Sequence, residues 1–375
     1  TDSEIDELYS QLDSQNIPAL LLQIRRTHDD PGEKSRSLFL NSTLQPPEAR
    51  RFYEVYSGIN PDKERDLKRI ISETPKNRTP FYFGLTCFEE EFKGLKSFVE
   101  RRLEDMNEDQ KDIMLFVSLV YLYGHKLFHP QHLAYYLGYE ATDLVNLENI
   151  LNDVQLELLV NEGEKWRPLH QSIANEILDQ ILSENVDSYK AKLSDLSCKF
   201  IKACGEEVYH ANDDLINLMR SLFIDRDESE AINTSTESDR NFSKIIEDIP
   251  NQEGKLSVLE CLTECFPKEA HFSAHLGRFY SIEMRDFDSA LDCIDKAISL
   301  NNEDSHLHHM KGMAIRHKIY KNFKNYNEDI IRNELIDLIK PEVEEASKAF
   351  EKARALKSDS EYPYVAHIDM IIRII

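Results

Sequence analysis

One segment near the carboxyl end of the chain carries the pattern of a tetratricopeptide repeat. In HLGRFYSIEMRDFDSALDCIDKAISL, small residues stand where two antiparallel helices would cross, and larger ones stand where they would fill the gap. The small positions are Gly277, Ala290 and Ala297, and the large positions are Leu276, Tyr280 and Ile294. One extra residue before Ala290 predicts an irregular turn. Because a single repeat cannot bury its apolar face, the pattern predicts stacked neighbours and a binding surface rather than a catalytic centre.

The pattern recurs towards the end of the chain. Gly312, in HHMKGMAIRHKIY, restarts a first helix, and a polar insertion over residues 321–340 follows it. The matching second helix has its small, large and small positions at Ala346, Phe350 and Ala353. A third unit begins at Tyr362. The alternative interpretation is that these are ordinary packed helices without a repeat.

Composition favours a mainly α-helical protein. The chain has 375 residues, of which 41% are hydrophobic, and Gly and Pro are scarce, while long segments show helical periodicity. This length suits two or three domains. No apolar run reaches about 18 residues, and no secretory signal opens the chain. The six cysteines have no disulfide-framework spacing, so we expect reduced thiols and a cytoplasmic location.

Charge argues against one class of partner. The net charge of −24 disfavours non-specific binding to DNA or RNA, which depends on neutralising phosphates. Residues 1–80 are nearly neutral, so most of the negative charge lies beyond them. Basic residues that could serve an anionic ligand there are Arg25, Arg26, Arg50, Arg51, Lys68, Arg69, Lys76 and Arg78. A solvated surface of mixed charge is the alternative, and charge alone favours it.

The first 80 residues have the features of a partial α/β domain. The apolar run IPALLLQIRR suits a buried parallel strand, and Arg25 and Arg26 would emerge at its carboxyl end, where such sheets bind ligands. LFLNSTL is predicted to be a second strand. Pro46 and Pro47 then begin a helix, and another helix is expected over residues 62–74.

Residues 81–183 are predicted to form a helical lid and a winged-helix domain. A helix is expected to open at residues 81–83, and others over about 94–104, 107–123, 144–153 and 173–182, with a short one in HPQHLAYYLG that ends at Gly138. LELLVNEGEKWRPLH is expected to be a hairpin that turns at Gly163. Residues 184–250 are predicted to be a helical connector with a polar linker at 225–243, and residues 251–375 to be the repeats.

At this point the chain resembles a known family. The order of parts, from an α/β piece through a helical lid and winged helix to tetratricopeptide-like repeats, is that of the STAND class of signal-transduction ATPases. It is most similar to the vertebrate sterile-alpha-motif-containing antiviral proteins and their bacterial antiphage counterparts. The resemblance is carried by PALLLQIRR, LQPPEARRFYEVY, PLHQSIANEIL and FSAHLGRFYSIEMRDFDSALDCIDKAISL.

The resemblance implies roles for four residues that would contact bound ATP or ADP. Arg26, or Arg25 beside it, corresponds to the arginine that senses the phosphates, a task suited to an always-charged guanidinium. Pro80 corresponds to the lid proline that packs near the adenine. His170 corresponds to the winged-helix histidine that contacts the β-phosphate of ADP and holds the closed state. Here Gln171 stands where the family pattern has an acid.

The parts that would catalyse hydrolysis are missing from this sequence. It has no G-x-x-x-x-G-K-[ST] phosphate loop, and no apolar run ending in paired acids precedes Ile17. Without the lysine and the Mg²⁺ that stabilise a transferring phosphate, hydrolysis cannot proceed. We therefore expect this chain alone not to hydrolyse ATP, and to belong to a longer protein whose amino-terminal part supplies the ATP site and the metal.

Other candidate clusters have weaker support. His125, His129 and His132 have a spacing that could bind zinc, but Pro130 interrupts them and no thiolates are near, so a surface role is favoured. The three histidines at positions 306, 308 and 309 cannot share one helix face. Cys261 and Cys265, one helical turn apart, are expected to pack in the core.

Three functions remain open at the level of sequence. The first is a regulatory fragment of an innate-immune STAND ATPase, whose repeats bind protein partners and whose parent protein forms homo-oligomers. The second is a tetratricopeptide-repeat scaffold without a nucleotide role. The third, a winged-helix DNA regulator, is the weakest, because the segment over residues 144–157 that would read DNA is acidic.

Overall fold

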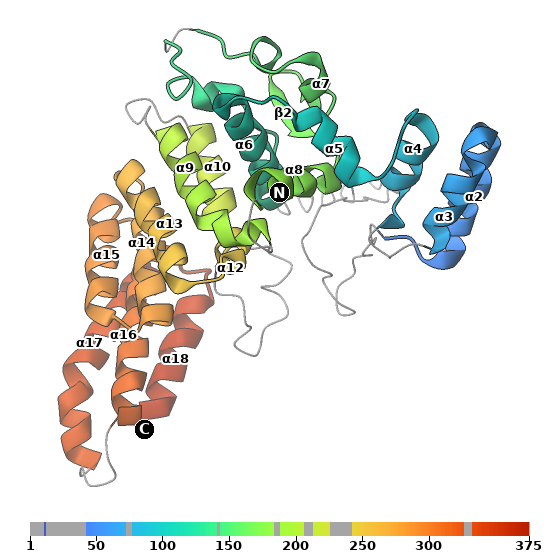
Figure 1. Ribbon diagram of the computed structural model, residues 1–375. Helices are drawn as coiled ribbons and strands as arrows, with labels where there is room; N and C mark the ends of the chain where they lie inside the picture. Colours follow the sequence, from blue (N-terminus) through green and yellow to red (C-terminus); the bar gives the residue numbers. More distant parts are fainter. Residues whose placement is uncertain are drawn as a thin grey trace. The chain divides into compact units, whose positions relative to one another are not determined.

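The computed structural model describes residues 11–12, 43–72, 77–140, 143–183, 188–205, 213–225, 242–325 and 332–374, with side chains described except at 323–338. Over these ranges the chain is mainly α-helical, and the described sheet is a single two-stranded hairpin (Figure 1). The expected helical class is therefore confirmed. The strand expected at 17–26 and most of the one at 38–44 lie outside the described residues. Within the described ranges, no helix is both long and apolar enough to cross a membrane.

The first described helices form a small cluster of their own. They are α2 (Pro46–Ile59), α3 (Glu64–Ser72) and α4 (Pro80–Phe88), with a 3-10 turn, η1 (Pro61–Lys63), between the first two. The start of α2 is fixed by proline and by a capping box, in which the Gln45 N–H donates to the Glu48 carboxylate at 2.7 Å. The apolar faces meet in a core made of Leu44, Ala49, Leu67, Ile70, Phe83 and Cys87.

Helix α6 (Glu108–Gly124) is the centre of the next part of the chain. Asn107 and Gln110 form a reciprocal capping box at its start. From Asp112 to Tyr121 every side chain is buried, as expected for a helix that is apolar all round. It packs against α8 (Gln171–Leu182) and the hairpin, and α5 (Leu95–Leu103) packs on α8.

The predicted hairpin is confirmed. Strands β1 (Leu159–Glu162) and β2 (Lys165–Pro168) pair antiparallel in the register Leu159–Pro168, and Gly163 adopts the left-handed φ of +77° that the tight turn requires. Phe128 forms a bridge to Trp166 on the outer side of β2, with both backbone hydrogen bonds at 2.8 Å. A third extended segment therefore joins the hairpin from before η3.

Two helices predicted ahead of the hairpin are different in the structure. The prediction of a helix over 144–153 is wrong. The chain forms a 3-10 turn, η4 (Leu147–Asn149), and a one-turn helix, α7 (Asp153–Leu156). The side chains of Asn146 and Asn152 accept nearby backbone N–H groups at 3.1 and 2.9 Å, which divides the segment into two short capped turns. The short helix in HPQHLAYYLG is a 3-10 helix, η3 (Pro130–Leu133), followed by turns to Gly138.

Further helices connect this part to the repeats. After the 3-10 turn η5 (Tyr189–Lys192) they are α9 (Leu193–Gly205), α10 (Asp213–Phe223), α12 (Lys244–Asp248) and α13 (Gln252–Cys265). One contiguous apolar core extends from Phe98 to Phe279 and includes side chains of all four of these helices. Nearly all of the predicted polar linker lies outside the described residues.

The carboxyl-terminal helices form the antiparallel pairs that the repeat pattern predicts (Figure 1). In the first pair, α14 (Ala270–Phe279) packs along α15 (Phe287–Leu300), and in the second, α16 (Ser305–Asn325) packs along α17 (Arg332–Leu356). The final helix is α18 (Tyr362–Ile374). The insertion expected over residues 321–340 therefore lengthens both helices of the second pair.

The two repeat glycines lie where the paired helices cross. A methyl group added at Gly277 would come within 2.7 Å of the Ala290 carbonyl oxygen and of the Ile294 side chain. One added at Gly312 would come within 2.6 Å of the Phe350 ring. The sequence pattern had matched Phe350 to Ile294, so the alignment of the two repeats is confirmed at the level of side-chain contacts.

The extra residue before Ala290 also has a structural explanation. Helix α14 ends in a π-helical turn, η7 (Tyr280–Met284), which holds one more residue than an α-helical turn of the same rise. Arg285 follows with a left-handed φ of +56°, and the Asp286 side chain then caps α15. The irregular turn lies inside the end of the first helix, and the crossing of the two helices is preserved.

Candidate functional site

Two of the four residues proposed to contact nucleotide lie at the starts of helices, and a neighbour of one contacts the other. Pro80 is the first residue of α4, and His170 is the N-cap of α8. The ring of Phe81, next to Pro80, stacks on the His170 imidazole with centroids 4.2 Å apart and planes 14° from parallel. Phe81 and His170, far apart in the sequence, therefore meet where two helices begin. Arg25 and Arg26 lie outside the described residues, so their proximity to this site remains a prediction.

The hydrogen bonds of His170 determine which ring nitrogen carries the proton in the neutral form. Its Nδ1 accepts the backbone N–H of Ser172 at 3.1 Å and lies 3.2 Å from the Ser172 hydroxyl. An acceptor nitrogen is unprotonated, so a neutral His170 carries its proton on Nε2. Helix α8 begins directly after this residue, and the positive end of the helix dipole favours a negatively charged group there.

A third residue near the start of α4, Arg78, is one of the basic residues that could serve an anionic ligand. Arg78 precedes the cap of α4, where the Thr79 hydroxyl accepts the Tyr82 N–H at 3.1 Å. The carbonyl of Arg78 accepts the Leu44 N–H at 2.6 Å, which fixes its backbone. Its side-chain Nε is buried and has no hydrogen-bond partner among the described residues. A buried guanidinium N–H of this kind is a candidate for contacting an anion.

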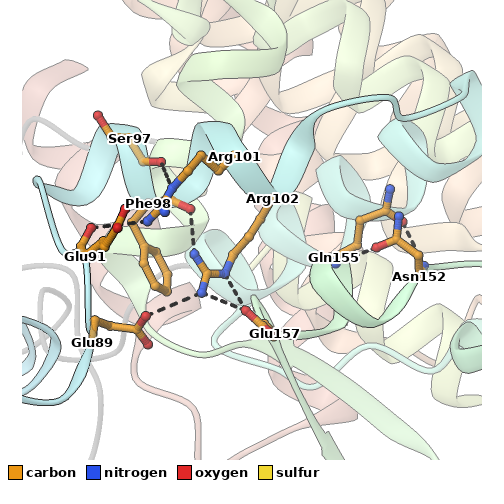
Figure 2. Close-up of polar contacts among 9 residues, drawn as sticks. All are labelled: Glu89, Glu91, Ser97, Phe98, Arg101, Arg102, Asn152, Gln155 and Glu157. Atoms are coloured by element: carbon orange, nitrogen blue, oxygen red, sulfur yellow. Dashed lines mark hydrogen bonds and ion pairs between the residues drawn. The ribbon is translucent and has the colours of Figure 1, made fainter.

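A polar cluster around Arg102 joins the segment after α4 to the segment before β1 (Figure 2). The Arg102 guanidinium donates to Glu157 at 2.7 and 2.9 Å, and its NH2 group lies 3.6 Å from Glu89. It also stacks over the Phe98 ring at 3.6 Å and donates to the Phe98 carbonyl. Because only 11% of the Arg102 side chain is exposed, these contacts are partly shielded from water.

The remaining residues of the cluster hold its two ends in place. Arg101 donates to the carbonyls of Ser97 and Glu91, which holds the chain between α4 and α5 against α5 (Figure 2). Asn152 and Gln155 form the capping box of α7, the helix that positions Glu157. Nothing in the sequence marks Arg102, because an Arg-Arg pair on a helix resembles an ordinary solvated face until its distant carboxylates are placed.

The histidine groups have local structural partners. His129 caps η3 by accepting the Gln131 N–H at 3.2 Å, and burial lowers the pKa of His132 to about 4. On α16, His306 and His309 lie near each other, while His308 bonds the Asn302 carbonyl at 2.9 Å, so the three do not share one face. Among the described residues, no group of three or more such side chains could hold a metal ion.

Comparison with known proteins gives only distant likenesses. No protein-family profile and no curated protein matches the chain. Among solved structures, a monomeric mutant of IFIT1 with m7Gppp-AAAA aligns over 74% of this chain and 75% of its own, at 13% identity and a TM-score of 0.29. The human IFIT1 dimer with m7Gppp-AAAA aligns over 75% of this chain and 74% of its own, at 14% identity and a TM-score of 0.28. Likeness at this level defines no function.

The described residues by themselves define the class. The chain is a mainly α-helical protein with one β-hairpin, and its carboxyl-terminal part is built from stacked antiparallel helix pairs with small residues at their crossings. Ahead of these pairs, a stacked contact joins the starts of α4 and α8. Arg102 contacts Glu89, which precedes α5, and Glu157, which follows α7.

Proposed function

We propose that this chain is the regulatory and sensor part of a STAND-type NTPase in innate immune defence against viruses or phages. In this proposal a longer protein supplies the phosphate loop, the metal site and the trigger of oligomerisation. The contact between α4 and α8 responds to bound ATP or ADP, and the helical repeats bind a protein partner.

The observation that carries the proposal is the stacking of Phe81 on His170. The resemblance gives Pro80 and His170 separate roles toward the same ligand, Pro80 toward the adenine and His170 toward the β-phosphate. They lie at the starts of two helices, and the residue after Pro80 stacks on His170 at 4.2 Å. An unrelated helical scaffold has no reason to bring these two positions together.

The order of elements from α6 to β2 gives further support. Helix α6 is followed by the extended residue Phe128, the turns η3 and η4, the short helix α7 and then the hairpin, with Phe128 paired beside β2. This is the arrangement expected for a winged helix whose wing is β1–β2. The one-turn α7 is too short to lie along a DNA groove, which agrees with the acidic segment in disfavouring a DNA-binding role.

The chemistry of the side chains fits a nucleoside diphosphate. Bound ADP supplies a negatively charged diphosphate and a flat apolar base. The Nε2–H of a neutral His170 is a donor for a phosphate oxygen, the Arg78 guanidinium is a second donor, and the Pro80 ring is an apolar surface for the base. We include Arg25 and Arg26 as phosphate contacts on the resemblance alone. Mg²⁺ would require the acidic strand that this sequence lacks.

A second candidate function is a repeat scaffold without a nucleotide role. It is favoured by α18, whose side opposite the buried Ala366 and Met370 exposes Val365, Ile368 and Ile372 at 64%, 58% and 66%. Exposed aliphatic side chains in one stripe of a helix are typical of a surface that binds another protein. In this case the first part of the chain would only support the repeats.

A matched pair of histidine variants separates the two functions. His170 and His129 both cap a helix by accepting, through Nδ1, the N–H two residues later. Replacing either with Ala removes a cap, but only His170→Ala removes the group proposed to contact ADP. In the complete protein, His170→Ala should raise defence activity without the trigger by roughly tenfold to a hundredfold, the population change for losing a contact of about 1.5–3 kcal/mol.

The controls in the same cell-based assay decide between the candidates. His129→Ala should leave the untriggered activity at the wild-type level, and Arg26→Ala should weaken the triggered response. If His170→Ala also behaves as wild type, the nucleotide roles are wrong and the scaffold function stands. Purified alone, the chain should show no ATP turnover above a heat-inactivated sample.

A further inference from the structure

Three cysteines form a row between α9 and α13, away from the site described above. Cys198 lies on α9, and Cys261 and Cys265 lie one turn apart on α13. The Cys261 thiol donates to the Cys198 carbonyl oxygen at 3.7 Å, and the Cys198 sulfur lies 3.8 Å from the Ser257 hydroxyl. Cys261 is 4% exposed, whereas Cys198 and Cys265 are half-buried. A reagent can therefore reach the outer thiols, while the middle one is covered.

The two helices approach closely on both sides of the thiols. A methyl group added at Gly254 would lie 3.0 Å from the Ser194 Cβ, and one added at Gly205 would lie 2.8 Å from the Cys265 Cβ. Glycines thus allow the backbones of α9 and α13 to come together at each end of the contact. A disulfide spans only about 4–7 Å between Cα atoms, so this close packing is a requirement for a bond between the helices.

The surroundings also favour the thiolate form at one position. The pKa of Cys198 is lowered chiefly by the neighbouring Cys261 thiol, with help from the Ser257 hydroxyl and from the positive charge of Lys202. The pKa of Cys265 is also lowered by the Cys261 thiol, and the pKa of Cys261 is raised chiefly by its two thiol neighbours and by burial. Elsewhere, burial raises the pKa values of Cys87 and Cys293.

We propose that Cys198, Cys261 and Cys265 form a peroxide-sensitive site, in which oxidised Cys198 forms a disulfide with Cys261 and joins α9 to α13. The Cys198 thiolate attacks one oxygen of hydrogen peroxide. An S–O bond forms, the O–O bond breaks, and the departing hydroxide takes up the proton that the Cys198 thiol released, giving water and a sulfenic acid. The Cys261 thiol then loses its proton and attacks the Cys198 sulfur. An S–S bond forms, and hydroxide leaves and is protonated to water.

The balance is two thiols and one peroxide giving one disulfide and two waters, with peroxide as the oxidant that the environment supplies. The bond would join the connector helix α9 to α13, the helix against which the first repeat helix α14 packs. Oxidation would therefore stiffen the connection between the repeats and the part of the chain that precedes them. The site is independent of the nucleotide proposal.

Peptide mass spectrometry of the full chain tests the site directly. The chain is treated with hydrogen peroxide, its free thiols are blocked, and it is digested without reductant. We expect one peptide from α9 linked to one from α13, a loss of two hydrogens in the intact mass, and reversal by a reductant. Cys198→Ser and Cys261→Ser should each abolish the linked peptide. Cys265→Ser and the distant control Cys293→Ser should retain it.

A second measurement depends on no variant. In the reduced chain at pH 7, iodoacetamide should modify Cys198 about tenfold faster than Cys293, since the thiolate is the reacting form. Equal rates at the two positions would overturn the proposed activation. A linked peptide that needs Cys265 in place of Cys198, or oxidation of Cys198 to the sulfinic acid with no linked peptide, would overturn the proposed bond.

Discussion

The repeat pairs and the contact between α4 and α8 are held together in different ways. Where α14 crosses α15, a glycine without a side chain lies against a backbone carbonyl, and there is no space for another atom. Where α4 meets α8, the Phe81 ring stacks on the His170 imidazole, and nearby the Arg102 ion pairs join the segment after α4 to the segment before β1. Close packing resists any change of spacing, whereas a few polar and stacking contacts can separate and form again. The repeats are thus suited to a fixed surface, and the helix starts to a switch.

The largest effect should come from adding bulk at the repeat crossing. Gly277→Ala places a methyl group 2.7 Å from the Ala290 carbonyl oxygen, and a backbone atom cannot move without shifting α15. We expect a loss of about 3 kcal/mol in the free energy of unfolding, the upper part of the range for overpacking, measured by urea denaturation. Ala290→Leu, from the other side of the crossing, should cost about 1–3 kcal/mol.

Gly58, in α2, provides the matched control. It is also helical, but an added methyl group would meet nothing within 4 Å. Gly58→Ala should therefore stabilise the chain by about 0.5–1 kcal/mol through helix propensity alone. If Gly277→Ala stabilises the chain by a similar amount, then α14 and α15 do not cross closely at this residue.

Acid should weaken the repeats next. Burial, with smaller effects from nearby arginines, lowers the pKa values of His309 and His317 on α16 to about 4. Between pH 6.5 and 4 the unfolded chain binds protons that these folded residues exclude, so stability falls as the pH falls through that window. Each residue contributes a slope of at most about 1.4 kcal/mol per pH unit.

Urea midpoints measured at intervals from pH 7 to 5 would detect this slope. His317 contacts the Ser281 hydroxyl at 3.0 Å, and His317→Gln keeps an amide near that hydroxyl. In this variant the free energy of unfolding should fall less steeply with falling pH, because one of the two histidines no longer titrates. An unchanged slope in that variant would mean that His317 titrates normally and is not buried as described.

A smaller effect is expected at the Arg102 cluster. Arg102→Ala removes the ion pairs to Glu157 and Glu89 and the stacking on Phe98, which should cost about 1–2 kcal/mol. Arg101, its neighbour, donates only to two carbonyls at 3.3 and 3.4 Å, so Arg101→Ala should cost clearly less. Equal costs for the two variants in thermal unfolding would show that Arg102 does not join the two segments.

The smallest effect on stability should come from the stacked rings. Phe81→Ala removes the contact with His170, which we expect to cost about 0.5–1.5 kcal/mol, since stacked pairs at partly exposed positions are weak. Its effect on function should be larger than its effect on stability. In the complete protein, Phe81→Ala should raise untriggered activity in the same direction as His170→Ala, and a drop in activity would contradict a closed state held by this contact.

Local patterns in the sequence were sufficient wherever neighbours along the chain determine the structure. The alternation of small and large residues predicted both helix pairs and matched Phe350 to the position that contacts the repeat glycine, Gly312. This works because residues three and four apart share a helix face. Alternating apolar residues on both sides of Gly163 predicted the two strands of the hairpin. Gly163 itself predicted the turn, because that position requires a left-handed backbone.

Local patterns failed where polar side chains compete with the helix. An apolar periodicity over residues 144–153 predicts a helix, yet Asn146 and Asn152 bond their own backbone and divide it into two turns. A short polar side chain offers the backbone an alternative to the helix, and apolar periodicity does not register this competition. The π-helical turn of η7 is similar, because an added residue can enter a loop or a helix at nearly equal cost.

Tertiary structure alone decided which distant residues meet. Nothing near Phe81 in the sequence indicates His170, nothing near Arg102 indicates Glu157, and nothing near Cys198 indicates Cys261. These contacts depend on how whole helices pack, which is the sum of many apolar side chains far from the residues themselves. The sequence by itself determined that the chain is helical and ends in repeats, and only the packing of its helices determined where a ligand, a switch or an oxidant could act.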